Sequence, residues 1–305
     1  MRKNKLKLKV PATSANLGPG FDCMGLGLKY YNTFIFEKIK DGIEIVVEDK
    51  KEGRLAINRE DNLIYRAVKE FSNRTGVKVA GWKILQQNRI PLARGMGSSA
   101  TAIIAALFGL NRLYDKPLSQ DEIIKIAVEI EGHADNVIPA FLGGFTINVQ
   151  TEDEIYYKKI PVNDHSLKLI LVIPDFQLKT SRLRQVLPEK VKYADAVFNQ
   201  GRTALLTAIF SSESWQLLKT AMEDKLHQDY RSELIPGFKE VIKSANEAGA
   251  LGSALSGAGP TIMALSRKNY EQIGEAMSGA FREKGVNASI LIRGVDNQGV
   301  RVIKE

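Results

Sequence analysis

The chain has 305 residues, of which 44% are hydrophobic and 26% charged, with a formal net charge of +8 and a single cysteine. This composition is typical of a globular protein with one large or two ordinary domains. No apolar run approaches the ~18–20 residues that span a bilayer, and no apolar signal core follows the basic first residues. Cys23 cannot form an internal disulfide and favours a reducing compartment. We therefore expect a cytoplasmic protein without a membrane partner.

The positive charge does not indicate a nucleic-acid partner. Residues 1–150 carry 22 basic and 16 acidic side chains and residues 151–305 carry 21 and 19, so the excess is 6 and 2. Nucleic-acid-binding proteins concentrate such charge in a stripe with interleaved aromatic residues, and this chain spreads it thinly. A modest positive field would help to attract an anionic nucleotide. We expect no nucleic-acid partner.

Apolar periodicity predicts strands and helices in alternation. In the first half we expect strands at 6–10, 33–39, 43–48, 82–86 and 145–149, and helices at about 62–74, 98–114 and 120–131. A charged stretch at 151–166 predicts a domain boundary. Beyond it we expect strands at 167–173, 261–265 and 288–292, and helices at about 180–186, 190–211, 214–224, 236–248 and 269–284. This order of elements predicts two α+β domains.

Residues 91–101 read Pro-Leu-Ala-Arg-Gly-Met-Gly-Ser-Ser-Ala-Thr. Gly95 and Gly97 leave the backbone bare beside a turn, and Ser98 and Ser99 are expected to cap the helix that follows. Bare amide groups at a helix N-terminus, with the positive end of the helix dipole behind them, bind phosphate. The segment lacks the Gly-Lys-Ser/Thr of a Walker loop and the context of a dinucleotide fingerprint. Taken alone, it also suits an ordinary capped helix.

Two further segments strengthen the phosphate interpretation. Residues 10–28 read Val-Pro-Ala-Thr-Ser-Ala-Asn-Leu-Gly-Pro-Gly-Phe-Asp-Cys-Met-Gly-Leu-Gly-Leu, and residues 249–262 read Gly-Ala-Leu-Gly-Ser-Ala-Leu-Ser-Gly-Ala-Gly-Pro-Thr-Ile. With residues 91–101 they have the order and rough spacing of three motifs of the GHMP small-molecule kinases, which the chain resembles over nearly its whole length. Within that family, residues 11–22 and the segment Gly-His-Ala-Asp-Asn-Val-Ile-Pro-Ala-Phe-Leu-Gly-Gly at 132–144 are most similar to the homoserine kinases.

The resemblance implies an α+β fold of two domains. An N-terminal mixed α/β domain is expected over residues 1–155 and a C-terminal ferredoxin-like domain over residues 166–305, with the active site in the groove between them. The implied activity is transfer of phosphate from ATP, with Mg²⁺, to the side-chain hydroxyl of L-homoserine in threonine biosynthesis. A homodimer is also expected.

Phosphoryl transfer requires positioning and charge neutralisation more than covalent chemistry by the protein. The resemblance places Asn62 near the adenine, although an N-cap role is equally open. Gly257 and Gly259 permit a close approach to phosphate or to the first motif, or form a tight core turn. The residues expected to bind the nucleotide are Asn62, Pro91, Leu92, Ala93, Arg94, Gly95, Met96, Gly97, Ser98, Ser99, Ala100, Thr101, Gly257 and Gly259.

Magnesium takes oxygen ligands, so Ser98 and Ser99 are candidates through their hydroxyl groups. A carboxylate is expected beside them. Glu129 and Glu131 stand two residues apart at the end of the helix 120–131 and point to different faces. Glu129 best matches a Gly-Glu-Leu segment of the homoserine kinases, although the stretch that follows is shorter here. We therefore favour Glu129, while Glu131 and a solvated charge stay open.

A loop after this helix is expected to hold His133, Asp135 and Asn136. The resemblance implies that His133 and Asp135 contact the amino-acid head of the substrate, with Asp135 facing its ammonium group. Related GHMP kinases have at the Asn136 position an Asp that can act as general base, and an amide cannot take up a proton. Ser98, Glu129 and Asn136 are thus the expected catalytic residues, acting by orientation and charge stabilisation.

The carboxylate of an amino-acid substrate needs a cation, and arginine suits it because its planar fork matches two carboxylate oxygens. The resemblance points to Arg184 and Arg231, with Thr180 near the first of them. Asn16 and Asp22 of the first motif complete the expected substrate side.

Two other functions remain open from the sequence. A GHMP kinase for mevalonate or a sugar is disfavoured by Asn136 and by the paired Arg184 and Arg231. A ligand-sensing regulator that has lost phosphoryl transfer is disfavoured by the intact phosphate loop together with Glu129 and Asp135, because a sensor need not preserve metal ligands.

Overall fold

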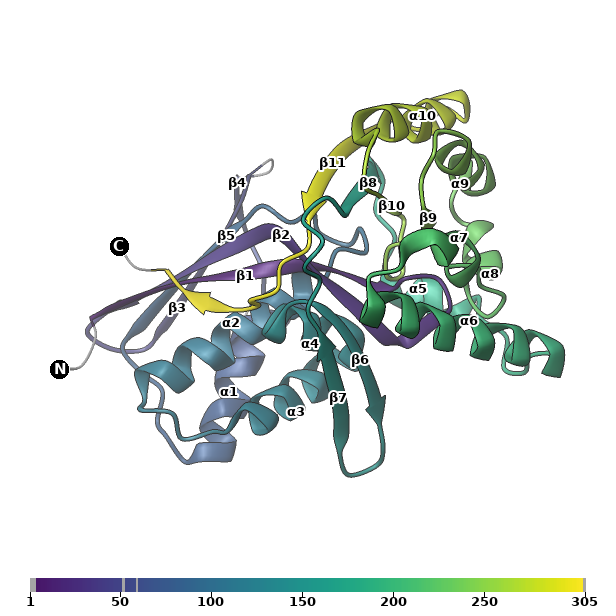
Figure 1. The fold of residues 1–305 in the computed structure, drawn as a ribbon. Helices are drawn as coiled ribbons and strands as arrows, with labels where there is room; N and C mark the ends of the chain where they lie inside the picture. Colours follow the sequence, from purple (N-terminus) through teal and green to yellow (C-terminus); the bar gives the residue numbers. More distant parts are fainter. Residues whose placement is uncertain (1–3, 51–52, 59, 304–305) are drawn as a thin grey trace.

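The computed structural model describes residues 4–50, 53–58 and 60–303, which fold into two β-sheets with their own helices (Figure 1). The larger sheet has the order β12-β1-β2-β5-β3-β4, with β6 paired to β2 and β7 paired to β6. Its strands are β1 (Lys5–Asn16), β2 (Gly20–Lys38), β3 (Ile43–Asp49), β4 (Gly53–Leu55), β5 (Trp82–Asn88), β6 (Phe145–Gln150), β7 (Ile155–Ile160) and β12 (Arg301–Val302). All pairs are antiparallel except β3 with β5.

Four helices cover one face of this sheet: α1 (Leu63–Thr75), α2 (Ser98–Leu113), α3 (Gln120–Glu131) and α4 (Ala134–Leu142). The first core lies between them and the sheet. Phe34 and Phe36 of β2 point into it and meet the almost wholly apolar α2 and the apolar face of α1. Helix α2 is hydrophobic nearly all round because other helices and the sheet surround it. The N-terminal half thus gives α2 a fixed position.

Four antiparallel strands form the smaller sheet in the order β11-β8-β10-β9. Counted along the chain this order is 4-1-3-2, the ferredoxin-like arrangement. The strands are β8 (Lys168–Pro174), β9 (Gly252–Leu255), β10 (Ile262–Ser266) and β11 (Ala288–Gly294). The helices of this half are α5 (Thr180–Gln185), α6 (Tyr193–Ser212), α7 (Leu218–Ala221), α8 (Gln228–Ser232), α9 (Phe238–Glu247) and α10 (Tyr270–Glu283), with a 3₁₀ turn at Trp215–Leu217.

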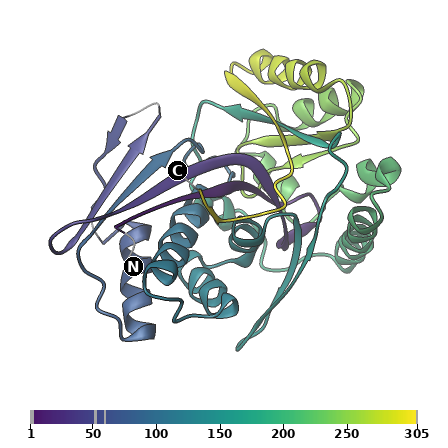
Figure 2. The ribbon, with the colours of Figure 1, turned by 60° about the vertical axis from the view of Figure 1, so that its left-hand side comes forward.

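Both faces of the smaller sheet are buried, which explains why β8 is a continuous apolar run. Ile170 and Val172 face a core formed with α9 and α10. Leu169 and Leu171 face the opposite core, which α6 and α7 share with the β1–β2 hairpin of the larger sheet. Figure 2 shows these two long strands extending from the first half toward the second. The two halves are therefore packed together through a common core.

The predicted two-part α+β architecture is confirmed, but several predicted elements differ. Strands β1 and β2 are far longer than the predicted segments 6–10 and 33–39. The two strands continue to pair through the first motif, whose backbone is buried and hydrogen-bonded although the motif contains turn-forming residues. Strand β7 lies inside the stretch predicted as a boundary, and α4 and β9 were not predicted. The predicted helix 214–224 is a 3₁₀ turn followed by the short α7.

We propose to divide the domains between β7 and β8 rather than at residue 155, because β7 continues the larger sheet to Ile160. β12 returns from the C-terminus to pair with β1, so this strand also belongs to the first sheet. No helix in the described part of the chain is long and apolar enough to cross a bilayer.

Candidate active site

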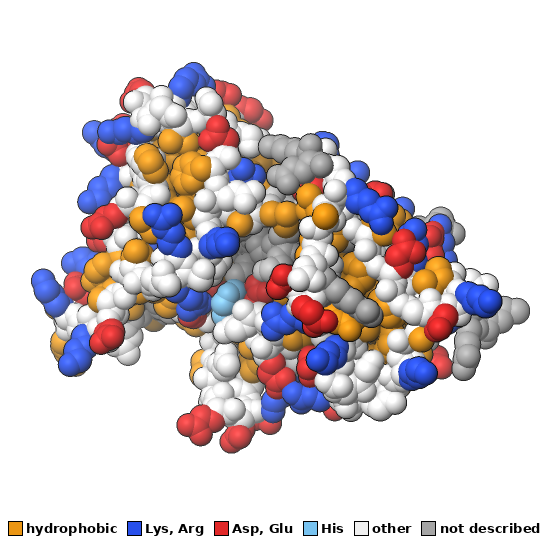
Figure 3. All heavy atoms as spheres, turned by 180° about the vertical axis from the view of Figure 1, so that it is seen from behind, with side chains coloured by type: hydrophobic (Ala, Val, Ile, Leu, Met, Phe, Trp, Pro, Cys, Tyr) orange, Lys and Arg blue, Asp and Glu red, His pale blue; other side chains and the backbone are white. Residues whose placement is uncertain are grey.

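A cavity of about 380 Å³ opens where the two halves meet. Figure 3 shows the surface hollowed between them. The walls carry polar residues from all three motifs and from α4, α5 and α8, and a mostly apolar patch from β3, β4 and the start of α1. The lining residues are Asn16, Asp22, Val47, Leu55, Ile57, Asp61, Asn62, Leu63, Gln86, Pro91, Leu92, Ala93, Arg94, Gly95, Met96, Gly97, Ser98, Ser99, Ala102, Glu131, His133, Asp135, Asn136, Lys179, Thr180, Arg184, Arg231, Gly257 and Ala258.

The three motifs meet at this cavity because hydrogen bonds join their loops. The bonds are Thr13 N–H to Met96 O, Gly257 N–H to Ala15 O, Asn16 Nδ2 to Gly257 O, and Ser256 Oγ to Gly95 O. Asn16 and Asp22 both have positive φ, of 70° and 57°. Asn and Asp tolerate this left-handed conformation better than other non-glycine residues.

Helix α2 presents its N-terminus to the cavity without a side-chain cap. The N-cap residue is Gly97, with φ 67°, and Ser98 and Ser99 are the first helical residues. The prediction that these serines cap the helix was therefore wrong. The amide groups of the first turn have no partner within the helix, so this end can accept an anion. A Cβ on Gly97 would overlap the hydroxyl oxygen of Thr13, which adds a packing reason for glycine.

The two serines at the start of α2 point to different partners. Ser98 is buried, and its hydroxyl donates to Asn88 Oδ1 at 3.1 Å and accepts from Asn32 Nδ2 at 3.4 Å. The hydroxyl of Ser99 donates to the carboxylate of Glu131. Ser98 thus takes part in a buried amide network below the loop, and Ser99 pairs with a carboxylate in the cavity wall.

Of the two glutamates at the end of α3, only Glu131 lines the cavity. Glu129 lies on the outer side, where its carboxylate pairs with Arg74 of α1 at 2.5 Å, and both side chains are more than 40% exposed. The structure thus keeps Glu129 away from the cavity, and Glu131 is the glutamate that faces it. Burial raises the pKa of Glu131, although the hydrogen bond from Ser99 and the charge of His133 lower it in part.

His133, Asp135 and Asn136 do not lie in a loop as predicted. His133 is the N-cap of α4, and the other two occupy its first turn. His133 Nδ1 lies 3.0 Å from Asp135 Oδ1. Burial alone would lower the pKa of His133, but its close contact with Asp135 and the charges of Asp135 and Glu131 outweigh this, and the pKa is raised.

The side chain of Asn136 is held at both ends. Its Oδ1 accepts a hydrogen bond from the Thr13 hydroxyl at 2.6 Å, and its Nδ2 donates to Asp135 Oδ1 at 3.1 Å. This arrangement fixes which end of the amide is oxygen. Thr13 was not singled out from the sequence, although it stands in the first motif. Its partner is 123 residues away, so no local signal could reveal the contact.

Arg184 and Arg231 lie in the same wall but in different surroundings. Arg184, on α5, is half-buried and forms a bidentate ion pair with Asp22. Arg231, on α8, is 1% exposed, donates from Nε to Leu183 O at 3.0 Å, and has Nη1 3.4 Å from Gly257 O. Burial and the charge of Arg184 lower the pKa of Arg231 to about 10.

The remaining predicted residues divide into lining and supporting positions. Asn62 lines the cavity and is also the N-cap of α1, where its side chain accepts from two backbone amides. Thr180 begins α5 at the cavity edge. Gly257 lines the cavity, whereas Gly259, Ala100 and Thr101 do not. Lys179, Gln86 and Ala258 line it without having been predicted.

The chain matches known proteins over nearly its whole length. The family model for the GHMP kinases N terminal domain matches residues 62–144, and that for the GHMP kinases C terminal matches residues 205–283. The homoserine kinase of Halothermothrix orenii is 50% identical over 295 residues, 96% of this chain and 94% of that protein. That of Clostridium beijerinckii is 42% identical over 300 residues, 98% of this chain and 99% of that protein.

A solved structure supports the same grouping. The homoserine kinase from Cytophaga hutchinsonii superposes with a TM-score of 0.90 at 31% sequence identity, and the match covers 99% of this chain and 98% of that one. The chain belongs to the GHMP kinase family and, within it, groups with the homoserine kinases.

Proposed function

We propose that this protein phosphorylates the side-chain hydroxyl of L-homoserine with ATP. One observation carries the proposal: a single cavity joins a helix N-terminus with free amides to a buried carboxylate and two arginines. The helix N-terminus suits phosphates. The buried carboxylate suits the ammonium group of an amino acid, and the two arginines suit its carboxylate. The near-complete matches to homoserine kinases agree with this division of the cavity.

The nucleotide phosphates bind at residues 91–101 in this proposal. The first turn of α2 supplies amide donors and the dipole of a 16-residue helix. The adenine lies toward the patch formed by Val47, Leu55 and Leu63, with Asn62 at its edge. Asn62 also serves as a helix cap, so both roles that the sequence left open are compatible with its position.

The oxygen donors in the wall fit a magnesium ion. Ser99 and Glu131 would hold it together with phosphate oxygens, because Mg²⁺ prefers hard oxygen ligands and keeps several of its waters. Glu131 is a carboxylate whose pKa is raised by burial, and a bound cation would favour its ionised form. When bound, the ion neutralises charge on the phosphates. Ser98 supports the loop through Asn88 and is a less direct ligand.

The substrate head group lies between α4 and the two arginines in this proposal. Asp135, which is 3% exposed, faces the ammonium group, and Arg231 and Arg184 bind the carboxylate. His133 fixes Asp135 from one side. Asn16, Asp22 and Thr180 complete the wall around the head group.

The reaction proceeds without a protein general base at Asn136. Its amide oxygen is occupied by the Thr13 hydroxyl and its amide nitrogen by Asp135, and an amide does not accept a proton at neutral pH. Asn136 therefore holds groups in place beside the reacting hydroxyl. The proton of that hydroxyl passes toward the phosphate, and catalysis rests on alignment and charge stabilisation.

A coupled assay of ADP release tests the function directly. Homoserine, mevalonate, galactose and threonine are supplied in turn with ATP and Mg²⁺. The proposal requires turnover with homoserine that clearly exceeds that with the other three. The proposal would be contradicted if ADP were released as fast without any acceptor as it is with homoserine.

We also propose that the protein forms a homodimer. In support, α6 exposes Tyr193 and Val197, residues that are 85% and 50% accessible, on a helix with few charged residues. Two exposed apolar residues one helical turn apart would fit the edge of a self-association surface. Sedimentation equilibrium tests this: a monomer at micromolar concentration would contradict it.

A further inference from the structure

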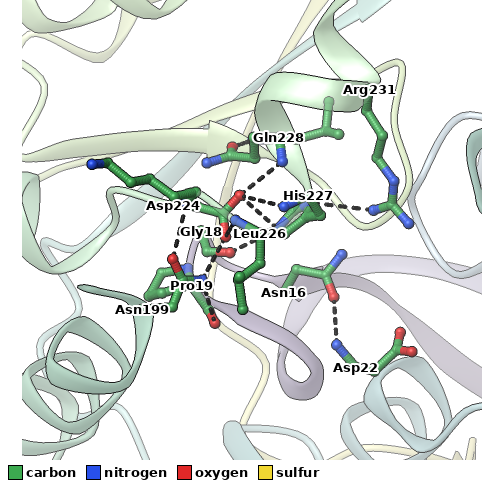
Figure 4. A network of polar contacts seen from close by, with 12 residues as sticks. Asn16, Gly18, Pro19, Asp22, Asn199, Asp224, Leu226, His227, Gln228 and Arg231 are labelled. Atoms are coloured by element: carbon green, nitrogen blue, oxygen red, sulfur yellow. Dashed lines mark hydrogen bonds and ion pairs between the residues drawn. The ribbon is translucent and has the colours of Figure 1, made fainter. Parts of the chain in front are cut away.

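A buried histidine, His227, lies beside Arg231 and contacts its guanidinium (Figure 4). It is 0% exposed and precedes α8, one helical turn before Arg231. It belongs to none of the three motifs. The side chain sits between the first-motif loop and the substrate wall, so its hydrogen bonds connect the two.

The two ring nitrogens of His227 have different partners, and these fix its protonation. Nε2 lies 2.8 Å from the carbonyl oxygen of Gly18. A carbonyl oxygen can only accept, so Nε2 carries a proton. Nδ1 lies 3.2 Å from Nη1 of Arg231, and a guanidinium can only donate. Nδ1 therefore offers its lone pair, and the ring is neutral; burial, which lowers the pKa of His227, favours the same form.

The turn that carries His227 is itself fixed by Asp224. The carboxylate of Asp224 is 0% exposed. It accepts hydrogen bonds from the amides of Leu226, His227 and Gln228 at 3.1, 3.0 and 2.7 Å, and from Asn199 Nδ2 at 2.6 Å. Its nearer oxygen is 3.6 Å from Nε2 of His227, farther than the Gly18 oxygen. Asp224 thus holds the backbone of the turn, and the ring bonds to Gly18.

The acceptor on the other side is equally constrained. Gly18 has φ +89°, and a Cβ there would overlap the carbonyl oxygen of Met222. The next carbonyl, that of Pro19, accepts from Asn199 and Thr203 of α6 at 3.4 and 3.2 Å. The first-motif loop therefore presents a stationary carbonyl to Nε2.

We propose that His227 is a positioning residue for Arg231. Nε of the guanidinium donates to Leu183 O. Nη1 has two neighbours, and His227 Nδ1, at 3.2 Å, is closer to it than Gly257 O, at 3.4 Å. Within the described part of the chain, Nη2 has no partner. His227 holds the guanidinium so that Nη2 faces the substrate carboxylate. This inference rests on the proposed function, because it assigns Arg231 to that carboxylate.

Two conservative variants separate the bonds of the ring. In H227Q the amide nitrogen can reach the Nε2 position and donate to Gly18, but no acceptor remains opposite Arg231. In H227N the amide oxygen stands near the Nδ1 position and can accept from Arg231, but the bond to Gly18 is lost. The full-length variants are assayed for ADP release with homoserine and with homoserine carboxamide, and their thermal unfolding is recorded.

We expect H227Q to raise the KM for homoserine about 10- to 100-fold, the range for a hydrogen bond to a charged group. The KM for ATP and the kcat should stay close to those of the unmodified protein. H227N should recover most of the loss. With the carboxamide, which lacks the negative charge, H227Q should lose little relative to the unmodified protein. In an R231A background, H227Q should add no further loss.

Three results would overturn the inference. These are an unchanged homoserine KM in H227Q, an equal loss with the carboxamide, or an H227N variant as impaired as H227Q with normal unfolding. If H227Q does not fold, H227N should still keep a homoserine KM near that of the unmodified protein, and a KM raised as far as in R231A would overturn the inference. Absence of homoserine turnover in the unmodified protein would instead remove the proposed function itself.

Discussion

The guanidinium of Arg184 and the carboxylate of Asp22 form two parallel hydrogen bonds, of 2.9 and 2.7 Å, across the edge of the cavity. Arg184 is therefore neutralised by the protein before a substrate arrives. Among the described residues, the hydrogen-bond acceptors of Arg231 are neutral: two carbonyl oxygens and an imidazole nitrogen. Arg184 is in an ion pair and Arg231 is in none among the described residues, so a substrate carboxylate should depend more on Arg231 than on Arg184.

Replacement of either arginine by alanine should raise the KM for homoserine, and R231A more than R184A. Removal of one partner of a desolvated charge pair typically costs on the order of 2–5 kcal/mol, roughly 30- to 4,000-fold. The KM for ATP should change little. R182A is the matched control, because Arg182 is on the exposed side of the same short helix as Arg184. Equal kcat/KM for homoserine and its carboxamide in the unmodified protein would show that no carboxylate clamp exists.

Glu131→Gln should lower kcat on the order of 100-fold or more, because it would remove the charged oxygen ligand proposed to hold Mg²⁺ beside the phosphates. The Mg²⁺ concentration for half-maximal activity should rise in parallel. Glu129→Gln provides the control: it breaks only an exposed pair with Arg74, worth about 0–1 kcal/mol of stability. Titration of activity with Mg²⁺ distinguishes the two variants. A raised Mg²⁺ requirement in Glu129→Gln and not in Glu131→Gln would show that Glu129 holds the metal.

Gly97→Ala should weaken ATP binding and lower turnover, because its Cβ would overlap Thr13 and disturb the Thr13–Asn136 bond. Gly76→Ala is a matched control: Gly76 has φ 68° against 67° for Gly97, and a Cβ there meets nothing within 4 Å. Both variants carry the strain of a left-handed alanine, about 1–2 kcal/mol. Calorimetric binding of ATP should fall in G97A alone; similar ATP affinity in both variants would contradict the placement of the phosphates.

Asn136→Leu should lower kcat through loss of two orienting hydrogen bonds, while the pH dependence of kcat keeps its shape. An amide has no proton to lose or gain near neutral pH, so its removal deletes no titrating group. Asn136→Asp should act differently, since a second carboxylate would face Asp135 across the present 3.1 Å contact. Like charges at that distance raise a pKa, and a new limb should appear in the profile. If the pH profile of kcat lost one of its limbs in N136L, Asn136 would be needed to keep a titrating base in place, and this expectation would be contradicted.

Asp296→Asn should destabilise the fold by about 3 kcal/mol without affecting the kinetics. Asp296 is buried away from the cavity and accepts from Arg301 and Tyr31 at 2.8 Å each, and breaking a buried pair is costly. Burial alone would raise the pKa of Asp296, but these bonds hold it below the ordinary 3.8. Its contribution is thus complete above pH 3.8 and lost as the pH falls through the folded-state pKa. The free energy of unfolding in urea should fall at acid pH in the unmodified protein, and D296N should lack this part of the fall.

Much of the fold and site follows from local sequence. Glycines with bare backbone before an apolar helical segment predict a tight turn followed by a helix, and the continuous apolar run of β8 indicates a strand buried on both faces. Helices α1, α2 and α3 were predicted within one residue at each end, because their periodicity and end signals agree. These features depend on residues within a few positions of one another.

The orientation of the side chains depended on tertiary packing. Helical spacing puts Glu129 and Glu131 on different faces, but only the packing of α3 beside α1 decides that Glu129 meets Arg74 and Glu131 meets Ser99. His227 has no motif around it and acquires its partner Gly18 from 209 residues away. Local patterns specify backbone conformation and burial. Which chemical groups meet in a cavity is set by long-range contacts, because those contacts alone decide which face of each element is turned inward.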